Sequence, residues 1–118
     1  MMVRKLFSNY TYGIYAEWLV IIYLVFKFYR ILKVRYKNKA GEIDIIAKKK
    51  NRIIFIEVKA RKNHLYLAET ISNYQLNRIK NSGEVFINFH KKYQNCDRQV
   101  DYVYVHKYKI YMHSQNIF

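Results

Sequence analysis

The segments Glu42-Ile-Asp-Ile-Ile-Ala47 and Arg52-Ile-Ile-Phe-Ile-Glu-Val-Lys59 decide the fold of this chain. The first alternates acidic with apolar residues, and the second is β-branched and apolar with charges at its far end, so both patterns predict β-strands. Between them lies the polar turn Lys48-Lys-Lys-Asn51, in which Asn51 can adopt a left-handed conformation. The two segments are therefore predicted to form a β-hairpin.

The turn of this hairpin fixes which residues lie opposite each other. If the loop has an even number of residues and is centred between Lys50 and Asn51, Asp44 lies directly across from Glu57, and Glu42 lies across from Lys59. Because side chains alternate between the faces of a strand, these four project from one side of the sheet. The neighbouring apolar side chains then project from the other side, into the core: Ile43, Ile45, Ile56 and Val58. An odd-sized turn would shift this register by one residue.

Two carboxylates that face each other across a strand pair need an explanation. Their Cβ atoms are ~5 Å apart, and like charges at that distance are destabilising. A divalent cation between Asp44 and Glu57 would offset the repulsion, since Mg²⁺ is usually held by one or two carboxylates with retained waters. Lys59 could then activate a water or stabilise charge on a phosphate. The alternative is that Glu57-x-Lys59 is only a solvated strand face with a weak ion pair.

The remaining segments surround this hairpin. A helix is expected at residues 13–28, a strand at 29–36, one or two helices within 67–93, and further strands at 99–106 and 109–112. The order helix, strand, hairpin, helix, strand predicts an α/β fold with a mixed β-sheet flanked by α-helices. Because the 118 residues contain neither a linker nor a repeat, we expect one domain over residues 1–118.

The charge composition favours a polyanionic partner. The chain has 22 Lys and Arg residues against 8 acidic ones, a formal net charge of +14. Nucleic acid is the commonest partner of so basic a protein, and a ribosomal or membrane-surface partner is the alternative. The 13 Tyr and 7 Phe residues would suit stacking on bases, but we interpret most of them as core.

The sequence lacks the signals that are typical of several other protein classes. A lone Cys96 and four scattered His residues give neither an internal disulfide nor a zinc site, and there is no phosphate-cradling loop. The apolar run from Trp18 to Phe26 is far shorter than the ~20 residues of a membrane span. We interpret this run as a buried helix in a cytoplasmic protein that does not enter a membrane.

The central motifs resemble those of the UPF0102 (YraN-like) family, small bacterial relatives of archaeal Holliday-junction resolvases. The resemblance rests on Gly41-Glu-Ile-Asp-Ile-Ile-Ala47 and Ile54-Phe-Ile-Glu-Val-Lys-Ala-Arg61. It extends to Gly13-x-x-x-Glu17 near the start of the chain and to Asn116-Ile-Phe118 at its end. It therefore covers nearly the whole sequence.

This resemblance implies a restriction-endonuclease-like core of the PD-(D/E)xK type that binds Mg²⁺ or Mn²⁺. By analogy, Asp44 and Glu57 bind the metal, Lys59 completes the catalytic set, and Glu17 is the helix glutamate that reaches the site or lies on the helix surface. Glu42 either supports the site or pairs with Lys59. The family often has a Lys in the helix after the hairpin, where this chain offers Gln75, either as a polar site residue or as part of the helix surface.

Function and partners follow as expectations. The main hypothesis is a metal-dependent endonuclease acting on DNA, with branched DNA as one candidate substrate, and the resemblance also allows a homodimer. The alternative is a nucleic-acid-binding protein that retains the nuclease fold without turnover. In either case basic side chains near the hairpin are expected to contact nucleic acid: Lys48, Lys49, Lys50, Arg61 and Lys62.

Overall fold

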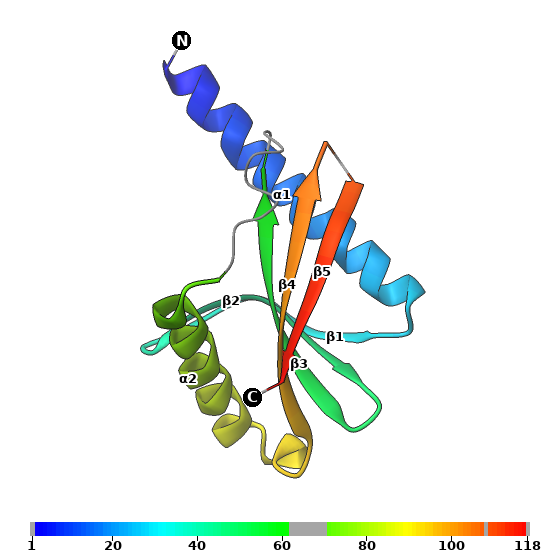
Figure 1. Ribbon diagram of the computed structural model, residues 1–118. Helices are drawn as coiled ribbons and strands as arrows, with labels where there is room; N and C mark the ends of the chain where they lie inside the picture. Colours follow the sequence, from blue (N-terminus) through cyan, green and yellow to red (C-terminus); the bar gives the residue numbers. More distant parts are fainter. Residues whose placement is uncertain (1, 62–70, 108, 118) are drawn as a thin grey trace.

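The computed structural model describes residues 2–61, 71–107 and 109–117, and within them a five-stranded sheet lies between two α-helices (Figure 1). A short 3-10 helix, η2, connects the second α-helix to the fourth strand. The elements in chain order are α1 (Met2–Phe26), β1 (Arg30–Asn38), β2 (Gly41–Lys49), β3 (Arg52–Ala60), α2 (Asn73–Phe89), η2 (Lys91–Tyr93), β4 (Asp97–His106) and β5 (Lys109–Ile117).

The strands follow one another across the sheet in chain order, β1-β2-β3-β4-β5. Neighbouring strands are antiparallel except β3 and β4, which are parallel and are connected through α2. The sheet is therefore mixed, and the α/β, restriction-endonuclease-like fold predicted from the sequence is confirmed. The chain reaches β4 by way of a helix because parallel neighbours cannot be joined by a tight turn.

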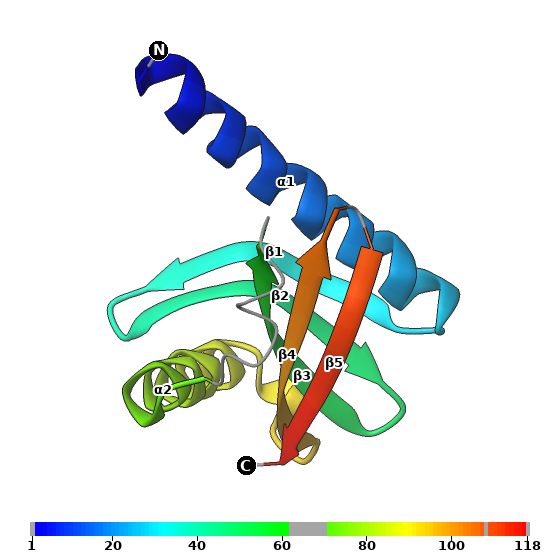
Figure 2. The ribbon, with the colours of Figure 1, turned by 45° about the horizontal axis from the view of Figure 1, so that its top comes forward.

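Each face of the sheet has its own hydrophobic cluster, and Figure 2 shows α1 and α2 on opposite faces. On one face, α1 buries Ala16, Val20 and Leu24. On the other face, α2 buries Ile79, Phe86 and Ile87. Strands β2 and β3 are largely buried on both faces because α1 covers one face of the sheet and α2 the other, which explains their nearly continuous apolar sequence.

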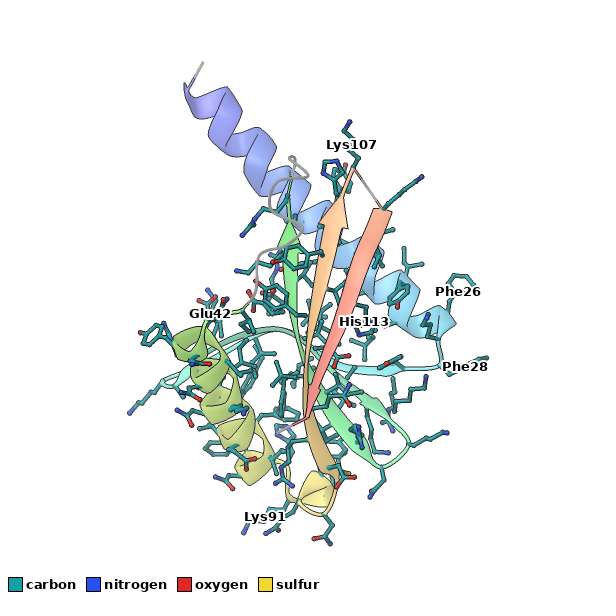
Figure 3. The ribbon with its side chains drawn as sticks, in the orientation of Figure 1. Phe26, Phe28, Glu42, Lys91, Lys107 and His113 are labelled. Atoms are coloured by element: carbon teal, nitrogen blue, oxygen red, sulfur yellow. The ribbon has the colours of Figure 1, made fainter. Side chains whose placement is uncertain are left out.

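The first helix is longer than predicted and only partly buried. Val20 and Leu24 are fully buried, but Trp18 is 60% exposed and Phe26 is 79% exposed, so the predicted burial of the whole apolar run is wrong. The reason is geometric, since only one side of a helix can pack against a sheet. Phe26 and the neighbouring Phe28 point away from the sheet (Figure 3). No helix in the described part of the chain is long and apolar enough to cross a membrane.

The hairpin between β2 and β3 has the predicted register, from Lys49 opposite Arg52 to Ile45 opposite Ile56. The positive φ in its turn belongs to Lys50 (φ 54°), so the expectation that Asn51 adopts this conformation is wrong. The two-residue connection requires a positive φ at one position, and here the lysine supplies it.

Pairing between β2 and β3 ends at Ile45 and Ile56, one pair before Asp44 and Glu57. Beyond this point β2 continues its pairing with β1 alone and bends away from β3. The alternation of side chains changes at the bend. Ile43 packs in the cluster beneath α2, whereas Ile45 packs beneath α1, so the prediction that both face one side is wrong.

Gly83 of α2 permits close packing of the helix on the sheet. A Cβ atom there would lie 2.5 Å from the ring of the fully buried Phe55. We expect Gly83→Ala to lower the free energy of unfolding by about 1–3 kcal/mol, measured by urea denaturation. Gly13→Ala is the matched control, because a Cβ atom at Gly13 would have nothing within 4 Å and alanine favours helix. Equal stability of the two variants would contradict this packing role.

Candidate active site

The end of the β2–β3 pairing opens a hollow between the sheet and the first turns of α2. Its volume is about 510 Å³. It is lined by two acidic side chains of β2, one of β3, and polar or apolar side chains of α2 and its N-cap: Glu42, Asp44, Glu57, Ser72, Tyr74, Gln75, Arg78 and Ile79. Where the strands separate, a side chain makes a hydrogen bond that a continued ladder would make.

Asp44 occupies the position where the ladder stops. Its Oδ2 atom accepts a hydrogen bond of 2.8 Å from the backbone N–H of Val58, a group that would otherwise be left without a strand partner. Burial raises the pKa of Asp44 to about 6, against the lowering effect of the Val58 hydrogen bond. The charge of Glu17 raises the pKa further, whereas Lys59 lowers it.

Glu57 lies beside Asp44 and is also mostly buried. Its Oε1 atom is 3.4 Å from Nζ of Lys59, and it accepts a hydrogen bond of 3.2 Å from Nε2 of Gln75. Burial raises the pKa of Glu57 to about 7, and the nearby charge of Asp44 adds to the shift. Lys59 opposes it through its charge and its hydrogen bond. The structure thus brings Asp44, Glu57 and Lys59 together as the sequence predicts.

The start of α2 places Gln75 at this site. Ser72 caps the helix, its Oγ accepting a hydrogen bond of 3.1 Å from the backbone N–H of Gln75. The first helical turn then points the Gln75 amide at Glu57. Gln75 thus lines the hollow in contact with Glu57, and its role as a polar site residue stays a prediction.

Glu17 of α1 lies close enough to affect Asp44 but is itself paired with Arg35. The Arg35 Nε atom donates a hydrogen bond of 2.8 Å to Oε2 of Glu17. Arg35 adopts a left-handed conformation (φ 55°) between the β1 residues that pair with Ile43 and Ile45. It was missed from the sequence, which gives no signal for a left-handed arginine inside a strand.

Glu42 lies beside the first turn of α2 (Figure 3). Its side chain is 65% exposed and its Oε1 atom lies 3.5 Å from Nζ of Lys37, so its ion pair is with Lys37. Lys59, predicted to lie across from it, pairs with Glu57 instead, because the ladder ends before these residues meet.

Arg78 lines the hollow and lies against Gly41, and neither was predicted as a site residue. Gly41 has a φ of 154°, and a Cβ atom there would lie 3.3 Å from Nε of Arg78. A side chain at this position would strain the backbone and displace the arginine. The Gly41-Glu42 pair in the motif is thereby explained, since the glycine lets the strand pass close to Arg78.

The donor set at this site fits a cation that keeps most of its water. Within the described residues, no group of three or more His, Cys, Asp or Glu side chains could enclose a metal ion. Asp44 and Glu57 nevertheless form a mostly buried pair of carboxyl groups, whose pKa values burial raises more than Lys59 lowers them. Two carboxylates with open space beside them suit Mg²⁺ or Mn²⁺, whereas calcium and structural zinc sites need more protein ligands.

The basic residues predicted to contact nucleic acid fall at two ends of the hairpin. Lys48, Lys49 and Lys50 lie at the β2–β3 turn, away from the acidic hollow. Arg61 directly follows β3, two residues beyond Lys59, and its backbone N–H bonds to the Val105 carbonyl. Lys62 lies outside the described residues.

Known proteins place this chain in a family. A family model described as "Uncharacterised protein family UPF0102" matches residues 16–105. The chain belongs to UPF0102. The matched range contains the helix glutamate, both hairpin strands, α2 and nearly all of β4, so the family assignment made from the motifs is confirmed.

Similar UPF0102 proteins occur in several bacteria. One from Mesorhizobium japonicum is 32% identical over 109 residues, covering 92% of this chain and 87% of the relative. One from Campylobacter hominis is 36% identical and covers 87% of this chain and 90% of the relative. One from Ehrlichia ruminantium is 40% identical, over 77% of this chain and 70% of the relative. The homodimer, the single domain and the cytoplasmic location stay predictions for this UPF0102 chain.

Proposed function

We propose that this protein is a Mg²⁺- or Mn²⁺-dependent endonuclease that hydrolyses phosphodiester bonds in DNA, with branched DNA as a candidate substrate. One observation carries the proposal. Asp44 and Glu57 lie side by side, mostly buried, where the strand ladder ends, with Lys59 3.4 Å from Glu57, in a chain of net charge +14. Such a pair of carboxylates destabilises the fold unless a cation occupies the hollow.

Each side chain has a role in this proposal. Asp44 and Glu57 would hold the metal, which would supply Lewis-acid activation of water and charge neutralisation on the phosphate. Gln75 holds the Glu57 carboxylate in place by its amide hydrogen bond, and the Val58 N–H does the same for Asp44. Lys59 presents its ammonium beside Glu57, where it would donate to a phosphate oxygen.

A second candidate function is binding of nucleic acid without hydrolysis. It is favoured by the excess of 22 basic over 8 acidic residues, which by itself accounts for salt-sensitive binding to a polyanion. It gives no reason for burying Asp44 next to Glu57. On this hypothesis Asp44→Ala would leave DNA binding largely unchanged, and no substrate would be cut.

Metal binding is the first test. We expect calorimetry to detect Mg²⁺ or Mn²⁺ binding to the wild type and to detect none in Asp44→Ala with Glu57→Ala. Glu84→Ala is the control, because Glu84 pairs with Arg98 away from the hollow. Linear, branched and single-stranded DNA would then be incubated with the wild type and each metal. No metal binding even with DNA present, or intact DNA in every reaction, would reject the endonuclease.

A further inference from the structure

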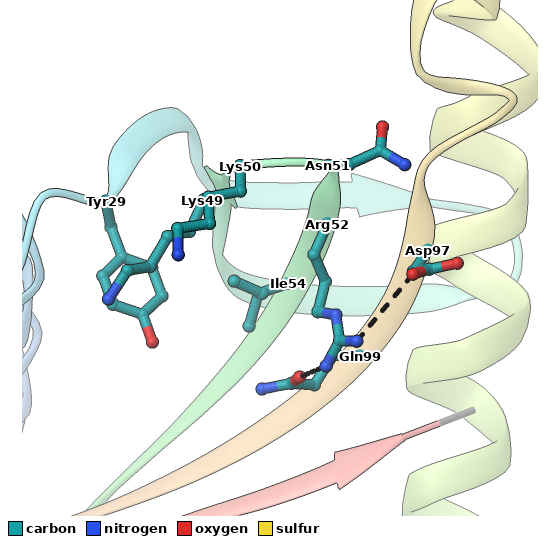
Figure 4. A pocket seen from close by; sticks show the side chains of 8 residues that line it. All are labelled: Tyr29, Lys49, Lys50, Asn51, Arg52, Ile54, Asp97 and Gln99. Carbon is teal, nitrogen blue, oxygen red and sulfur yellow. Dashed lines mark hydrogen bonds and ion pairs between the residues drawn. The ribbon is translucent and has the colours of Figure 1, made fainter.

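A second hollow, of about 370 Å³, lies at the β2–β3 turn (Figure 4). Tyr29 and Ile54, both buried in the cluster beneath α1, form its apolar walls. Three cationic side chains surround its opening, namely Lys49, Lys50 and Arg52. This hollow is separate from the acidic site, because it is at the opposite end of β3 from Glu57 and shares no lining residue with it.

Arg52 is fixed within this hollow by two partners. Its Nη1 atom donates a hydrogen bond of 2.6 Å to Oε1 of Gln99, and its Nη2 atom lies 3.8 Å from Oδ2 of Asp97 (Figure 4). A guanidinium carries five N–H donors, so two such contacts leave others for a ligand. The side chain keeps 37% of its surface exposed. Arg52 is therefore held in one orientation while remaining accessible.

The support behind Arg52 continues into the protein interior. Gln99 donates a hydrogen bond of 2.6 Å to Oδ1 of the fully buried Asp101. The other Asp101 oxygen lies 2.6 Å from Nε2 of His113, and His113 Nδ1 lies 2.9 Å from the Tyr23 hydroxyl. This chain of contacts joins β3, β4, β5 and α1. It fixes the orientation of the Gln99 amide, which in turn fixes the guanidinium of Arg52.

The hollow has an excess of positive charge. Lys49, Lys50 and Arg52 outnumber Asp97, the acidic side chain that lines the hollow. The Nζ atom of Lys49 lies 4.7 Å from the centroid of the Tyr29 ring, which compensates part of its charge. Cations gathered around one hollow repel one another, and an anion bound in the hollow would offset that repulsion.

We propose that this hollow binds a phosphate group, with Arg52 as the oriented donor and Lys49 and Lys50 as additional cations. A planar guanidinium held at its edge matches the oxygens of a phosphate, and arginine is the residue best suited to such bidentate contacts. The phosphate comes either from a nucleic-acid chain or from a free phosphate compound. The proposal does not require hydrolysis, so it stands or fails independently of the acidic site.

Nuclear magnetic resonance gives a residue-specific test. ¹⁵N-labelled protein would be titrated with inorganic phosphate at constant ionic strength, following the Arg52 Nε–H, the Gln99 side-chain amide and the Asn51 backbone amide. We expect these signals to move together and to saturate. Arg52→Gln should weaken binding about tenfold or more, since it removes a charge-assisted donor. Circular dichroism checks that the variant is folded.

Lys39→Gln is the matched control for Lys50→Gln, because both lysines are exposed and lie in consecutive hairpin turns. We expect Lys50→Gln to weaken phosphate binding more than about threefold and Lys39→Gln to change it by less than about twofold. Equal effects of the two, or unchanged binding in Arg52→Gln, would mean diffuse attraction to a basic surface and would overturn the proposal.

Two further ligands identify the source of the phosphate. A short single-stranded oligonucleotide would be added with and without a 5′-phosphate, in the presence of EDTA to prevent cleavage. Displacement of inorganic phosphate by both would assign the hollow to phosphodiesters of a nucleic-acid chain. Displacement by the 5′-phosphorylated form alone would assign it to terminal or free phosphates. If neither oligonucleotide nor inorganic phosphate shifts the Arg52 signal, no phosphate site exists here.

Discussion

Lowering the pH from 8 to 5 will stabilise the metal-free protein, by about 3–5 kcal/mol in the free energy of unfolding. The cause is the buried pair of Asp44 and Glu57. Burial raises their pKa values from 3.8 to about 6 and from 4.5 to about 7. Between the unfolded and folded pKa values the folded state binds more protons than the unfolded state, so stability rises as the pH falls through this window. Below about pH 3 both states are protonated and this contribution is constant.

The measurement is urea denaturation in EDTA at several pH values, followed by circular dichroism. The control is Asp44→Asn with Glu57→Gln, in which the amide oxygen introduced at position 44 could still accept the Val58 N–H. We expect the slope of stability against pH to flatten in this variant, and saturating Mg²⁺ to flatten it in the wild type. Parallel slopes for wild type and variant would mean that the two carboxyl groups titrate normally and are not buried together.

The hairpin was predictable because its register depends on local sequence. A polar two-residue turn between alternating segments allows few pairings, and the observed pairs from Ile45 with Ile56 to Lys49 with Arg52 agree with the predicted one. The end of this ladder was not predictable. It coincides with the bend of β2 beside the left-handed Arg35 of β1, and neither feature leaves a local pattern in the sequence. The side on which Ile43 packs was therefore wrong.

The site residues that lie within the hairpin motif were predictable. Those that the tertiary structure brings in from other elements were not. Asp44, Glu57 and Lys59 lie within one hairpin, so strand alternation alone places them near one another. Gln75 reaches Glu57 only because α2 begins at Ser72 and packs beside β2. The chain of contacts from Tyr23 to His113 joins residues 90 positions apart, a separation at which a single sequence gives no pairing signal.

Replacing Lys59 by Met will reduce DNA cleavage by about 10²–10³-fold, if the protein is the endonuclease proposed above. The Lys59 ammonium has two effects that one substitution removes. It lowers the pKa values of Asp44 and Glu57, so its loss makes both carboxyl groups harder to ionise and raises the pH needed for metal binding. The substitution also removes the positive charge that would stabilise a phosphate oxygen in the transition state. The optimum pH for cleavage should accordingly move upward.

Lys59→Met should leave DNA binding nearly unchanged. A loss of cleavage without a loss of binding would therefore assign Lys59 to the reaction. Lys59 is one of 22 basic residues, so its loss lowers the salt dependence of binding by the contribution of about one phosphate contact. Single-turnover cleavage and fluorescence anisotropy on the same DNA separate the two effects. Lys33→Met, which removes an exposed lysine of β1, controls for net charge. A Lys59→Met protein that cuts DNA within about threefold of the wild-type rate would exclude Lys59 from the reaction. In that case the ion pair with Glu57 would serve only to compensate a buried carboxylate.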